Sequence, residues 1–434
     1  MSKPLCVFQS PIWTRSGYGD WAESIAKSLL RYDKFDLALI PTRWGNCSKK
    51  NLQSELSSDE ETQALISKIL QQPLQKQPEI FIQCTIPNEF QPHGKFNIGM
   101  TAGIETTVPA GVWIEGLNRM DFNVATSVHS QKVFEAVNYT KAYSDGRKEV
   151  VKLQKPCEVL FWGANTDIFK KSDEQNDHLE KFMSRVKEEF AFLFVGQWTA
   201  NNINADRKDI GMLIKTFIET FRSFPADKKP CLILKTSGAA LCKIDKYDCI
   251  GKLKSLIASV GENPNNPKVY ILHGELTDAE MNALYNHKKV KAHVSFTHGE
   301  GFGHPLLLAS LSVKPVLAPN WSGHLDFLDG KLCKLLSGEI KQIPGEAVND
   351  WFVKESGWFN VNYFTAGEVM KNVYKNYDNY RSNAELLAKI NSEKFNIKAM
   401  DKIFHEMLDR VVPKFATEQK IVLPKLKKLN INKP

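Results

Sequence analysis

Apolar positions in the first part of the chain form short runs that alternate with longer, helically spaced sets. Trp21, Ile25 and Leu29 lie four residues apart and predict a helix over residues 18–31. Alternation of strands with helices indicates a parallel sheet covered on both faces. Strands are predicted at residues 5–9, 37–41, 80–83, 97–101, 122–125 and 158–161, and further helices at 60–70, 110–117 and 130–136.

A second series of the same kind follows a polar stretch at residues 165–177. We predict an α/β fold of two doubly wound, Rossmann-like domains that face a central cleft, at residues 1–170 and 171–412. Helices at 366–412 close the second domain, and a basic tail covers residues 413–434. Ligands of such sheets bind at the carboxyl ends of the strands. The second series comprises strands at 190–195, 231–235, 269–272, 291–295 and 313–317, and helices at 210–221, 252–260, 278–286 and 305–311.

Composition narrows the class of protein. Hydrophobic residues make up 42% and charged residues 24% of the 434 residues, which is typical of a folded globular chain. No run approaches the roughly 20 apolar residues that span a bilayer, and the start is too polar for a secretory signal. We therefore expect a cytoplasmic protein without a transmembrane segment. The eight cysteines lack zinc-type spacing, so we expect no structural metal.

The chain carries a formal net charge of +8. Such a charge favours polyanionic partners, including nucleic acid, anionic membrane surfaces and phosphorylated substrates. Part of the excess lies in the tail after Pro413, where six lysines face only Glu418. DNA binding through the basic surface and tail, and peripheral membrane contact, are both compatible with this charge. A tail that is merely solvated is the alternative.

A glycine-rich turn with one carboxylate separates the predicted strand at 291–295 from the next helix. Gly301 and Gly303 allow close backbone approach, and Pro305 suits the first helical position. The free N–H groups of that helix end form an anion site. Glu300 is the only carboxylate in the turn, and we expect it to bind sugar hydroxyls. A plain strand–turn–helix connection is the alternative.

Adjacent cations precede the helix predicted at 210–221. Arg207 and Lys208 are unfavourable next to the positive end of a helix dipole, which indicates another reason for their presence. Two such cations would neutralise the charge on a departing nucleotide diphosphate. Lys235 ends the strand predicted at 231–235 and is expected to face the same cleft.

Motifs recur in an order that resembles retaining GT-B glycosyltransferases of family 4, over residues 5–410. Segments at 195–196, 207–208, 234–238, 272–276 and 300–305 resemble the donor domain of that family. Residues 156–167 are similar to its hinge-proximal element, and Gly17-Tyr-Gly19 resembles its glycine-rich loop near the diphosphate. The resemblance implies front-face transfer with retention, a nucleotide-diphosphate sugar (most readily a UDP-sugar) as co-substrate, and no additional cofactor.

The resemblance also implies roles for individual residues. Arg207 and Lys208 would bind the donor diphosphate and Glu300 the transferred sugar. One position departs from the family: its second glutamate, which binds the ribose, is replaced by Leu308, and Asp326 is our candidate for that role. The remaining donor-binding candidates are Gly17, Gly19, Lys235, Gly274, Leu276, Phe302, Gly303, His304 and Pro305.

The first domain is expected to bind the acceptor. Glu105 follows the strand at 97–101 and is a candidate for orienting the acceptor hydroxyl, with a dipole-stabilised carboxylate at a helix start as the alternative. His129 follows another strand end and is either an acceptor residue or a structural histidine.

The acceptor itself has competing candidates. The segments around Glu105 and at 320–328 resemble family-4-type transferases of large tailed phages, some of which glycosylate hydroxymethylated DNA bases. A base in a duplex would have to be flipped out, and the enzyme would act in the host cytoplasm. The alternatives are a saccharide or lipid-linked acceptor, a sugar-nucleotide epimerase, and a non-catalytic nucleic-acid-binding protein. A dehydrogenase is disfavoured because no Gly-x-Gly-x-x-Gly follows the first strand.

Overall fold

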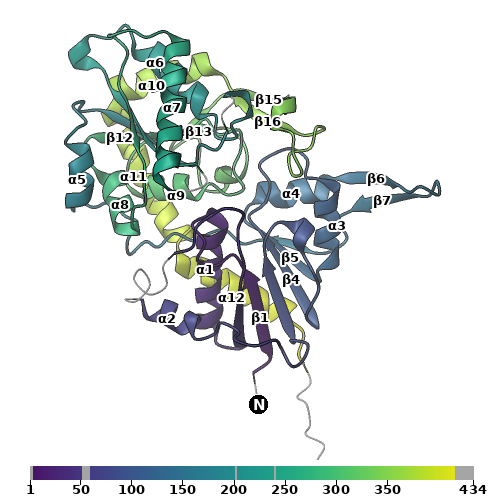
Figure 1. Cartoon of the computed structure of the whole chain (residues 1–434). Helices are drawn as coiled ribbons and strands as arrows, with labels where there is room; N and C mark the ends of the chain where they lie inside the picture. The colour runs from purple at the N-terminus through teal and green to yellow at the C-terminus, as the bar shows by residue number, and fades with distance from the viewer. Residues whose placement is uncertain (1–2, 51–58, 201–202, 239–240, 416–434) are drawn as a thin grey trace, which may run out of the picture.

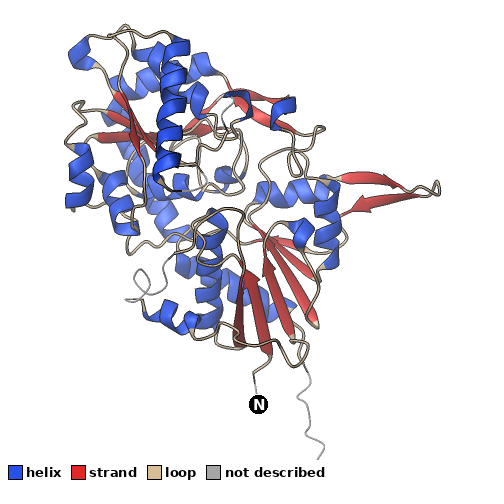
Figure 2. Ribbon diagram, viewed as in Figure 1, coloured by secondary structure: helices blue, strands red, loops and turns tan. Residues whose placement is uncertain are grey.

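The computed structural model describes residues 3–50, 59–200, 203–238 and 241–415, and its two halves are each built on a six-stranded parallel sheet (Figures 1 and 2). The first sheet has the order β2-β1-β3-β4-β5-β8 and the second the order β11-β10-β9-β12-β13-β14. The expected pair of doubly wound sheets is confirmed. The basic-tail prediction falls mainly on residues 416–434, which lie outside the described part of the chain.

The first half follows the predicted alternation of strands and helices. Its strands are β1 (Leu5–Ser10), β2 (Asp36–Pro41), β3 (Ile80–Cys84), β4 (Phe96–Thr101), β5 (Phe122–Ala125) and β8 (Cys157–Val159), and its helices α1 (Gly17–Tyr32), α2 (Glu60–Ile66), α3 (Gly111–Arg119) and α4 (Val128–Ala136), with a short 3₁₀ turn η1 (Pro87–Glu89). A hairpin that the sequence analysis missed, β6 (Asn138–Ala142) and β7 (Lys148–Lys152), lies between α4 and β8.

The second half repeats the pattern and ends in three consecutive helices. Its strands are β9 (Ala191–Val195), β10 (Cys231–Lys235), β11 (Val269–Leu272), β12 (Val290–Val294), β13 (Val316–Pro319) and β14 (Lys334–Leu336), with a hairpin of β15 (Gly338–Gln342) and β16 (Gly357–Val361). Its helices are α5 (Asp177–Met183), α6 (Ile210–Phe221), α7 (Lys243–Val260), α8 (Asp278–Asn286), α9 (His304–Leu311), α10 (Tyr363–Lys375), α11 (Tyr377–Lys394) and α12 (Ile397–Val411), and its 3₁₀ turns η2 (Ile203–Ala205), η3 (Ala226–Lys228), η4 (Gly323–Asp326) and η5 (Gly345–Ala347).

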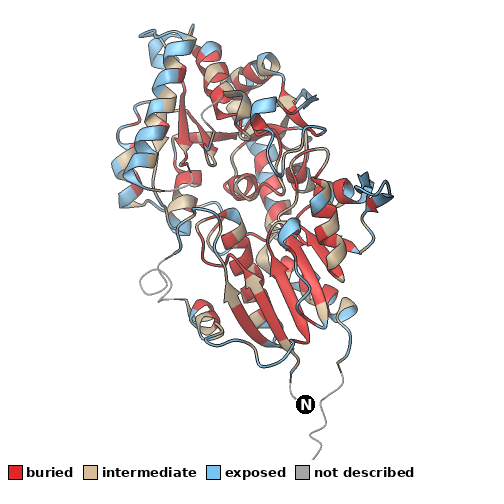
Figure 3. Cartoon of the chain, turned by 45° about the vertical axis from the view of Figure 1, so that its right-hand side comes forward, coloured by how far each residue is buried: buried red, intermediate tan, exposed pale blue. Residues whose placement is uncertain are grey.

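Strand order determines which loops meet at the centre of the molecule. In the second sheet β9 lies between β10 and β12, and in the first β1 lies between β2 and β3, so the direction of winding reverses at these strands. Loops that follow such strands diverge and leave room for a ligand. Burial follows the same plan: the central strands of both sheets are buried, the edge strand β11 is half-buried, and exposed residues line the outer helices (Figure 3).

The last helix returns to the first half of the chain. Arg31 of α1 binds Asp401 of α12 through its Nε at 2.7 Å, and His405 of α12 contacts Ser28 of α1. Figure 1 shows α12, in yellow, beside the purple α1. The C-terminal segment therefore packs across both halves. The expected boundary between the halves near residue 170 stays a prediction.

Two helix starts differ from the sequence-based expectation. The helix predicted from residue 18 begins at Gly17. Gly17 and Gly19, which the resemblance placed in a glycine-rich loop, thus form the first turn of α1, where the Ser16 hydroxyl caps the helix by accepting from the Gly19 N–H at 3.0 Å. Helix α7 begins at Lys243 rather than at residue 252. In the described part of the chain, no helix combines the length and apolarity needed to cross a membrane.

Candidate active site

The turn after β12 touches the loop after β4, and this contact joins the two halves. A Cβ on Gly301 would lie 2.0 Å from the Ala102 carbonyl oxygen, and one on Gly299 would lie 2.3 Å from the Glu105 carbonyl oxygen. Any side chain at either position would push the two backbones apart. The glycines therefore permit a direct backbone contact beside Glu300.

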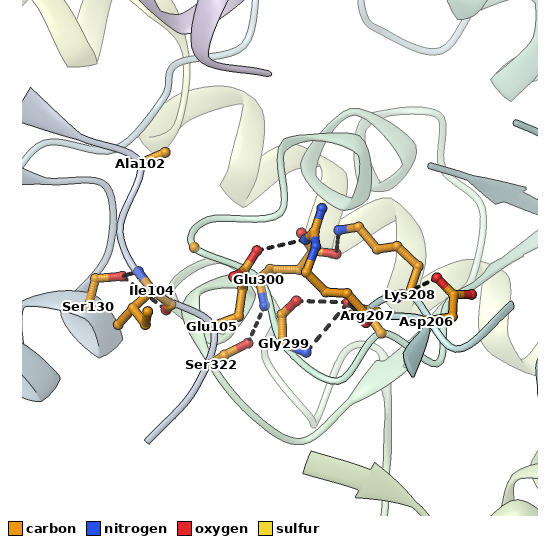
Figure 4. A network of polar contacts seen from close by, with 12 residues as sticks. Ala102, Ile104, Glu105, Ser130, Asp206, Arg207, Lys208, Gly299, Glu300 and Ser322 are labelled. Carbon is orange, nitrogen blue, oxygen red and sulfur yellow. Dashed lines mark hydrogen bonds and ion pairs between the residues drawn. The ribbon is translucent and has the colours of Figure 1, made fainter. Parts of the chain in front are cut away.

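Glu300 is held from both sides in this turn (Figure 4). Its backbone N–H donates to the Ser322 hydroxyl at 2.8 Å, and its carboxylate accepts from Lys208 Nζ at 2.5 Å. Each of the two side chains is only 13% exposed. Burial acts to raise the pKa of Glu300, but the charges of Lys208 and Arg207 outweigh it and lower the pKa. Glu300 is therefore an ionised acceptor of hydrogen bonds at neutral pH.

The segment that carries the two cations is fixed by a buried carboxylate. Asp206 is 1% exposed and accepts from the N–H groups of Ile210 at 2.8 Å and Lys208 at 3.3 Å. The Arg207 carbonyl accepts from the His298 N–H at 3.0 Å, which ties the segment to the turn after β12. Burial, followed by repulsion from Arg207, lowers the pKa of Lys208. Sequence reasoning missed Asp206, although an acid just before a helix is a recognisable signal.

Arg207 contacts the first half through Glu105. Its guanidinium donates to the Glu105 carboxylate at 2.6 Å, and the Glu105 carbonyl accepts from the Trp321 indole N–H at 3.0 Å. The side chains of Arg207 and Glu105 are 31% and 22% exposed, so this ion pair is open to solvent on one side. Two predicted cations and two predicted carboxylates thus meet in one cluster (Figure 4).

A second group of predicted residues gathers at the start of α9. The His304 imidazole stacks on Trp162, with ring centroids 3.6 Å apart, and a Cβ on Gly17 would lie 4.0 Å from the same indole. Burial lowers the pKa of His304 to about 3, so the ring is neutral at physiological pH. Its Nε2 has no hydrogen-bond partner among the described residues. Gly303 adopts a φ of 90° and is the N-cap residue of α9, and its carbonyl accepts from the Leu306 N–H at 2.9 Å.

The side chain of Phe302 does not face the site. It is 5% exposed and packs on Phe327 with ring centroids 5.1 Å apart. Pro305 occupies the first turn of α9, as expected. The role that the resemblance implied for the backbone at residues 302–305 stays a prediction.

Lys235 and Gly274 also come together, at the ends of β10 and β11. The Lys235 ammonium donates to the Gly274 carbonyl at 2.7 Å, and burial lowers the pKa of Lys235 against the opposing effect of Glu275. Glu275, which the sequence analysis did not single out, forms an ion pair with Arg15 of the first half at 2.5 Å. Leu276 is half-buried against the larger core. The ion pair between Glu275 and Arg15 forms a second bridge between the halves.

Asp326 and His129 lie close together at the start of α4. The Asp326 carboxylate accepts from the Val128 N–H at 2.9 Å, at the start of α4, and burial raises its pKa. His129 packs edge-on against Trp321, with ring centroids 4.8 Å apart, and burial lowers its pKa to about 4. Asp326 thus binds the backbone of the first half, and its expected role in ribose binding stays a prediction. Leu308 is 9% exposed and belongs to the core.

Further residues that the sequence analysis missed support the site from behind. Tyr18 accepts from the Ala102 N–H at 3.0 Å and contacts the Thr101 hydroxyl at 2.9 Å, so it fixes the loop after β4. One indication in the sequence points to these positions: Tyr18, Trp321 and Ser322 lie within segments that resemble the family. Within the described residues, no group of three or more metal-ligating side chains is placed to hold an ion.

No protein-family model and no curated protein sequence matches the chain. Solved structures resemble it over nearly its whole length. HepE of Anabaena in complex with UDP and glucose is 13% identical, covers 94% of this chain and 99% of its own, and gives a TM-score of 0.59. The chain has the GT-B fold. Sucrose-phosphate synthase of Thermosynechococcus elongatus is 10% identical, covers 94% of this chain and 98% of its own, and gives a TM-score of 0.60. Trehalose-6-phosphate synthase OtsA is 11% identical, covers 95% of this chain and 100% of its own, and gives a TM-score of 0.58.

Proposed function

We propose that this GT-B chain is a retaining glycosyltransferase that moves a sugar from a nucleotide-diphosphate sugar to an acceptor hydroxyl. One observation carries the proposal: Arg207 and Lys208 meet Glu105 and Glu300 where the loops of the two sheets touch. A cluster of two cations and two carboxylates at such a point has the charges that a diphosphate and a sugar require. Each cation already has a carboxylate partner that a phosphate oxygen is able to replace.

A UDP-sugar is the donor that we propose. HepE structures contain UDP with glucose and UDP-glucose, and HepE shares the fold of this chain. In our scheme Arg207 and Lys208 bind the diphosphate, while backbone N–H groups at residues 302–304 contribute further donors. Glu300 then binds hydroxyls of the transferred sugar. Lys235 and residues 274–276 bind the nucleoside.

The reaction is a single front-face displacement. The bond between the anomeric carbon and the diphosphate oxygen breaks, and the acceptor oxygen bonds to that carbon on the same face. The departing phosphate oxygen takes the acceptor's proton, so the products are the nucleoside diphosphate and the glycosylated acceptor. Arg207 and Lys208 stabilise the charge that grows on the diphosphate. Glu105, released from Arg207, orients the acceptor hydroxyl.

A hydroxymethylated base in phage DNA is the acceptor that we favour. The net charge of +8 suits a polyanionic substrate, and the base reaches the cleft when it is flipped out of the duplex. A saccharide or lipid-linked acceptor is the second candidate, supported by the glucose bound with UDP in HepE. A phage origin would place the reaction in the host cytoplasm.

Thermal unfolding with a panel of nucleoside diphosphates and sugar nucleotides tests the donor half of the proposal. A ligand of the folded state raises the apparent Tm, so one diphosphate should raise it selectively. That donor is then incubated with hydroxymethylated DNA and with saccharides, and transfer is measured by mass spectrometry. No shift with any nucleotide at millimolar concentration would refute the donor site and favour a non-catalytic nucleic-acid-binding protein. Conversion of the donor without an acceptor would indicate an epimerase.

A further inference from the structure

The β6–β7 hairpin projects from the first half as a separate two-stranded ribbon (Figures 1 and 2). Its strands pair antiparallel, with Asn138 opposite Lys152 and Ala142 opposite Lys148. Side chains alternate between the two faces of a ribbon. One face therefore carries Tyr139, Lys141, Tyr143, Arg147, Glu149 and Val151, and the other carries Asn138, Thr140, Ala142, Lys148, Val150 and Lys152.

The first of these faces, the inner face, attaches the ribbon to the acceptor side of the site. The Tyr139 hydroxyl donates to the Pro109 carbonyl, and Lys141 forms an ion pair with Glu115 of α3 at 2.5 Å. Val151 is only 7% exposed. Pro109 belongs to the loop that leads from Glu105 into α3. The ribbon is thus fixed to the segment that carries the carboxylate assigned to the acceptor.

The other face, the outer face, is fully exposed and carries positive charge alone. All six of its residues are exposed, and Lys148 and Lys152 form no ion pair within the described part of the chain. The acids of the ribbon are directed elsewhere: Asp145 at the tip pairs with Arg147 at 2.6 Å, and Glu149 accepts from Tyr143 on the inner face. No carboxylate offsets the two lysines on their own face.

We propose that the outer face of the β6–β7 ribbon binds the phosphodiester backbone of duplex DNA and holds the acceptor against the cleft. This inference rests on the proposed DNA acceptor. Lys148 and Lys152 lie four residues apart on one strand, about 13 Å at about 3.3 Å per residue, so they reach separate phosphates. Between them on the outer face lies Val150, with Thr140 opposite it, and both side chains are shorter than a lysine. A two-stranded ribbon has the width that the major groove admits.

An anionic membrane fits this ribbon less well. A membrane-binding tip needs several apolar side chains that enter the headgroup layer. The turn at residues 143–146 instead contains Tyr143, Ser144, Asp145 and Gly146, and the single large aliphatic side chain exposed on the outer face is Val150. Lysines with so little apolar surface around them suit contacts that position a nucleic acid through its phosphates.

The test compares Lys148→Glu/Lys152→Glu with a control, Lys389→Glu/Lys398→Glu, in the full chain. The control makes the same change in net charge at exposed positions on α11 and α12, which lie apart from the ribbon in Figure 1. Affinity for a short unmodified DNA duplex is measured by fluorescence anisotropy over a salt series. Each phosphate contact contributes about 0.9 to the slope of log K against log salt. The ribbon variant should lose about two units of slope and at least about tenfold in affinity, while the control keeps the wild-type slope.

Equal slopes for the ribbon variant and the control would overturn the inference, as would wild-type binding to phosphatidylserine vesicles without binding to DNA. The shift of Tm with UDP must be the same in all three proteins, which shows that both variants fold. Transfer to hydroxymethylated DNA is measured separately. If the ribbon variant lost slope but the wild type transferred no sugar to DNA, the DNA-acceptor proposal alone would be refuted. If the wild type transferred sugar but the ribbon variant kept the wild-type slope, the ribbon proposal alone would be refuted.

Discussion

Arg207, from the second half of the chain, donates a hydrogen bond to the Glu105 carboxylate of the first half at 2.6 Å. The neighbouring Lys208 pairs with Glu300 at 2.5 Å. In the free protein, both cations assigned to the diphosphate are therefore neutralised by carboxylates assigned to sugar and acceptor. Donor binding then exchanges carboxylate for phosphate at Arg207 and releases Glu105 to face the acceptor. Such an exchange favours binding of the donor before the acceptor.

Glu105→Gln should bind UDP more tightly and transfer sugar more slowly. The amide still accepts from Arg207 but lacks the charge that competes with phosphate, a difference of about 1 kcal/mol, or about fivefold in Kd. Isothermal titration with UDP and a transfer assay check the two effects. Glu339→Gln, at an exposed ion pair on β15, is the control. Weaker UDP binding by Glu105→Gln would contradict the exchange.

Glu300→Gln and Lys208→Met should each lower kcat/KM by about 100-fold or more, the usual effect of removing one charge that stabilises a transition state. The double variant should be about as slow as either single variant, because residues that act as a unit are not additive. Glutamine and methionine keep the size of the side chains, so circular dichroism should be unchanged. Near-normal rates in both single variants would show that the donor site lies elsewhere.

Much of the fold was predictable because its signals are local. The apolar spacing over residues 210–221 predicted α6 with its exact bounds, and strands β10 and β11 were also predicted exactly. Charged residues that follow parallel strands were also expected to lie together, because the carboxyl ends of such strands meet at one edge of the sheet. The β6–β7 hairpin was missed because its exposed outer face carries no alternating apolar pattern.

Contacts between the halves could not be predicted from local pattern. Glu105 and Arg207 are far apart in sequence, and their pairing depends on how the two sheets face each other. Asp326 illustrates the same problem, because its carboxylate binds the Val128 N–H of the other half. At α1, the cap by Ser16 drew Gly17 and Gly19 into the helix. A serine directly before the glycines was a local signal for that start.

Gly301→Ala should destabilise the protein and impair transfer. The new Cβ would lie 2.0 Å from the Ala102 carbonyl oxygen, so the halves must separate and the Glu105–Arg207 contact must lengthen. We expect a Tm lower by several degrees and a weaker stabilisation by UDP. Gly251→Ala is the control: nothing lies within 4 Å of its Cβ, and it should stabilise α7 by about 0.5–1 kcal/mol. If the two variants had equal Tm values, the close contact at Gly301 would not exist.

His293 should make the folded state less stable as pH falls below 6.5. The residue is 2% exposed on β12, neither ring nitrogen has a hydrogen-bond partner among the described residues, and burial lowers its pKa to about 3. Above pH 6.5 both states are neutral. Between pH 6.5 and 3 only the unfolded state binds the proton, so the free energy of unfolding falls by up to about 1.4 kcal/mol per pH unit.

His293→Leu should remove the contribution of one proton to the slope of the free energy of unfolding against pH. Because the substitution also removes two unpaired buried nitrogens, it should not destabilise the protein at pH 7. The slope will not vanish, since burial also lowers the pKa of His298 to about 4 and that of His304 to about 3. Urea unfolding between pH 7 and 4 measures the difference. Phe217→Leu, a core change without a titrating group, should lower the free energy of unfolding equally at every pH. If the free energy of unfolding of His293→Leu depended on pH as that of the wild type does, His293 would titrate alike in the folded and unfolded states.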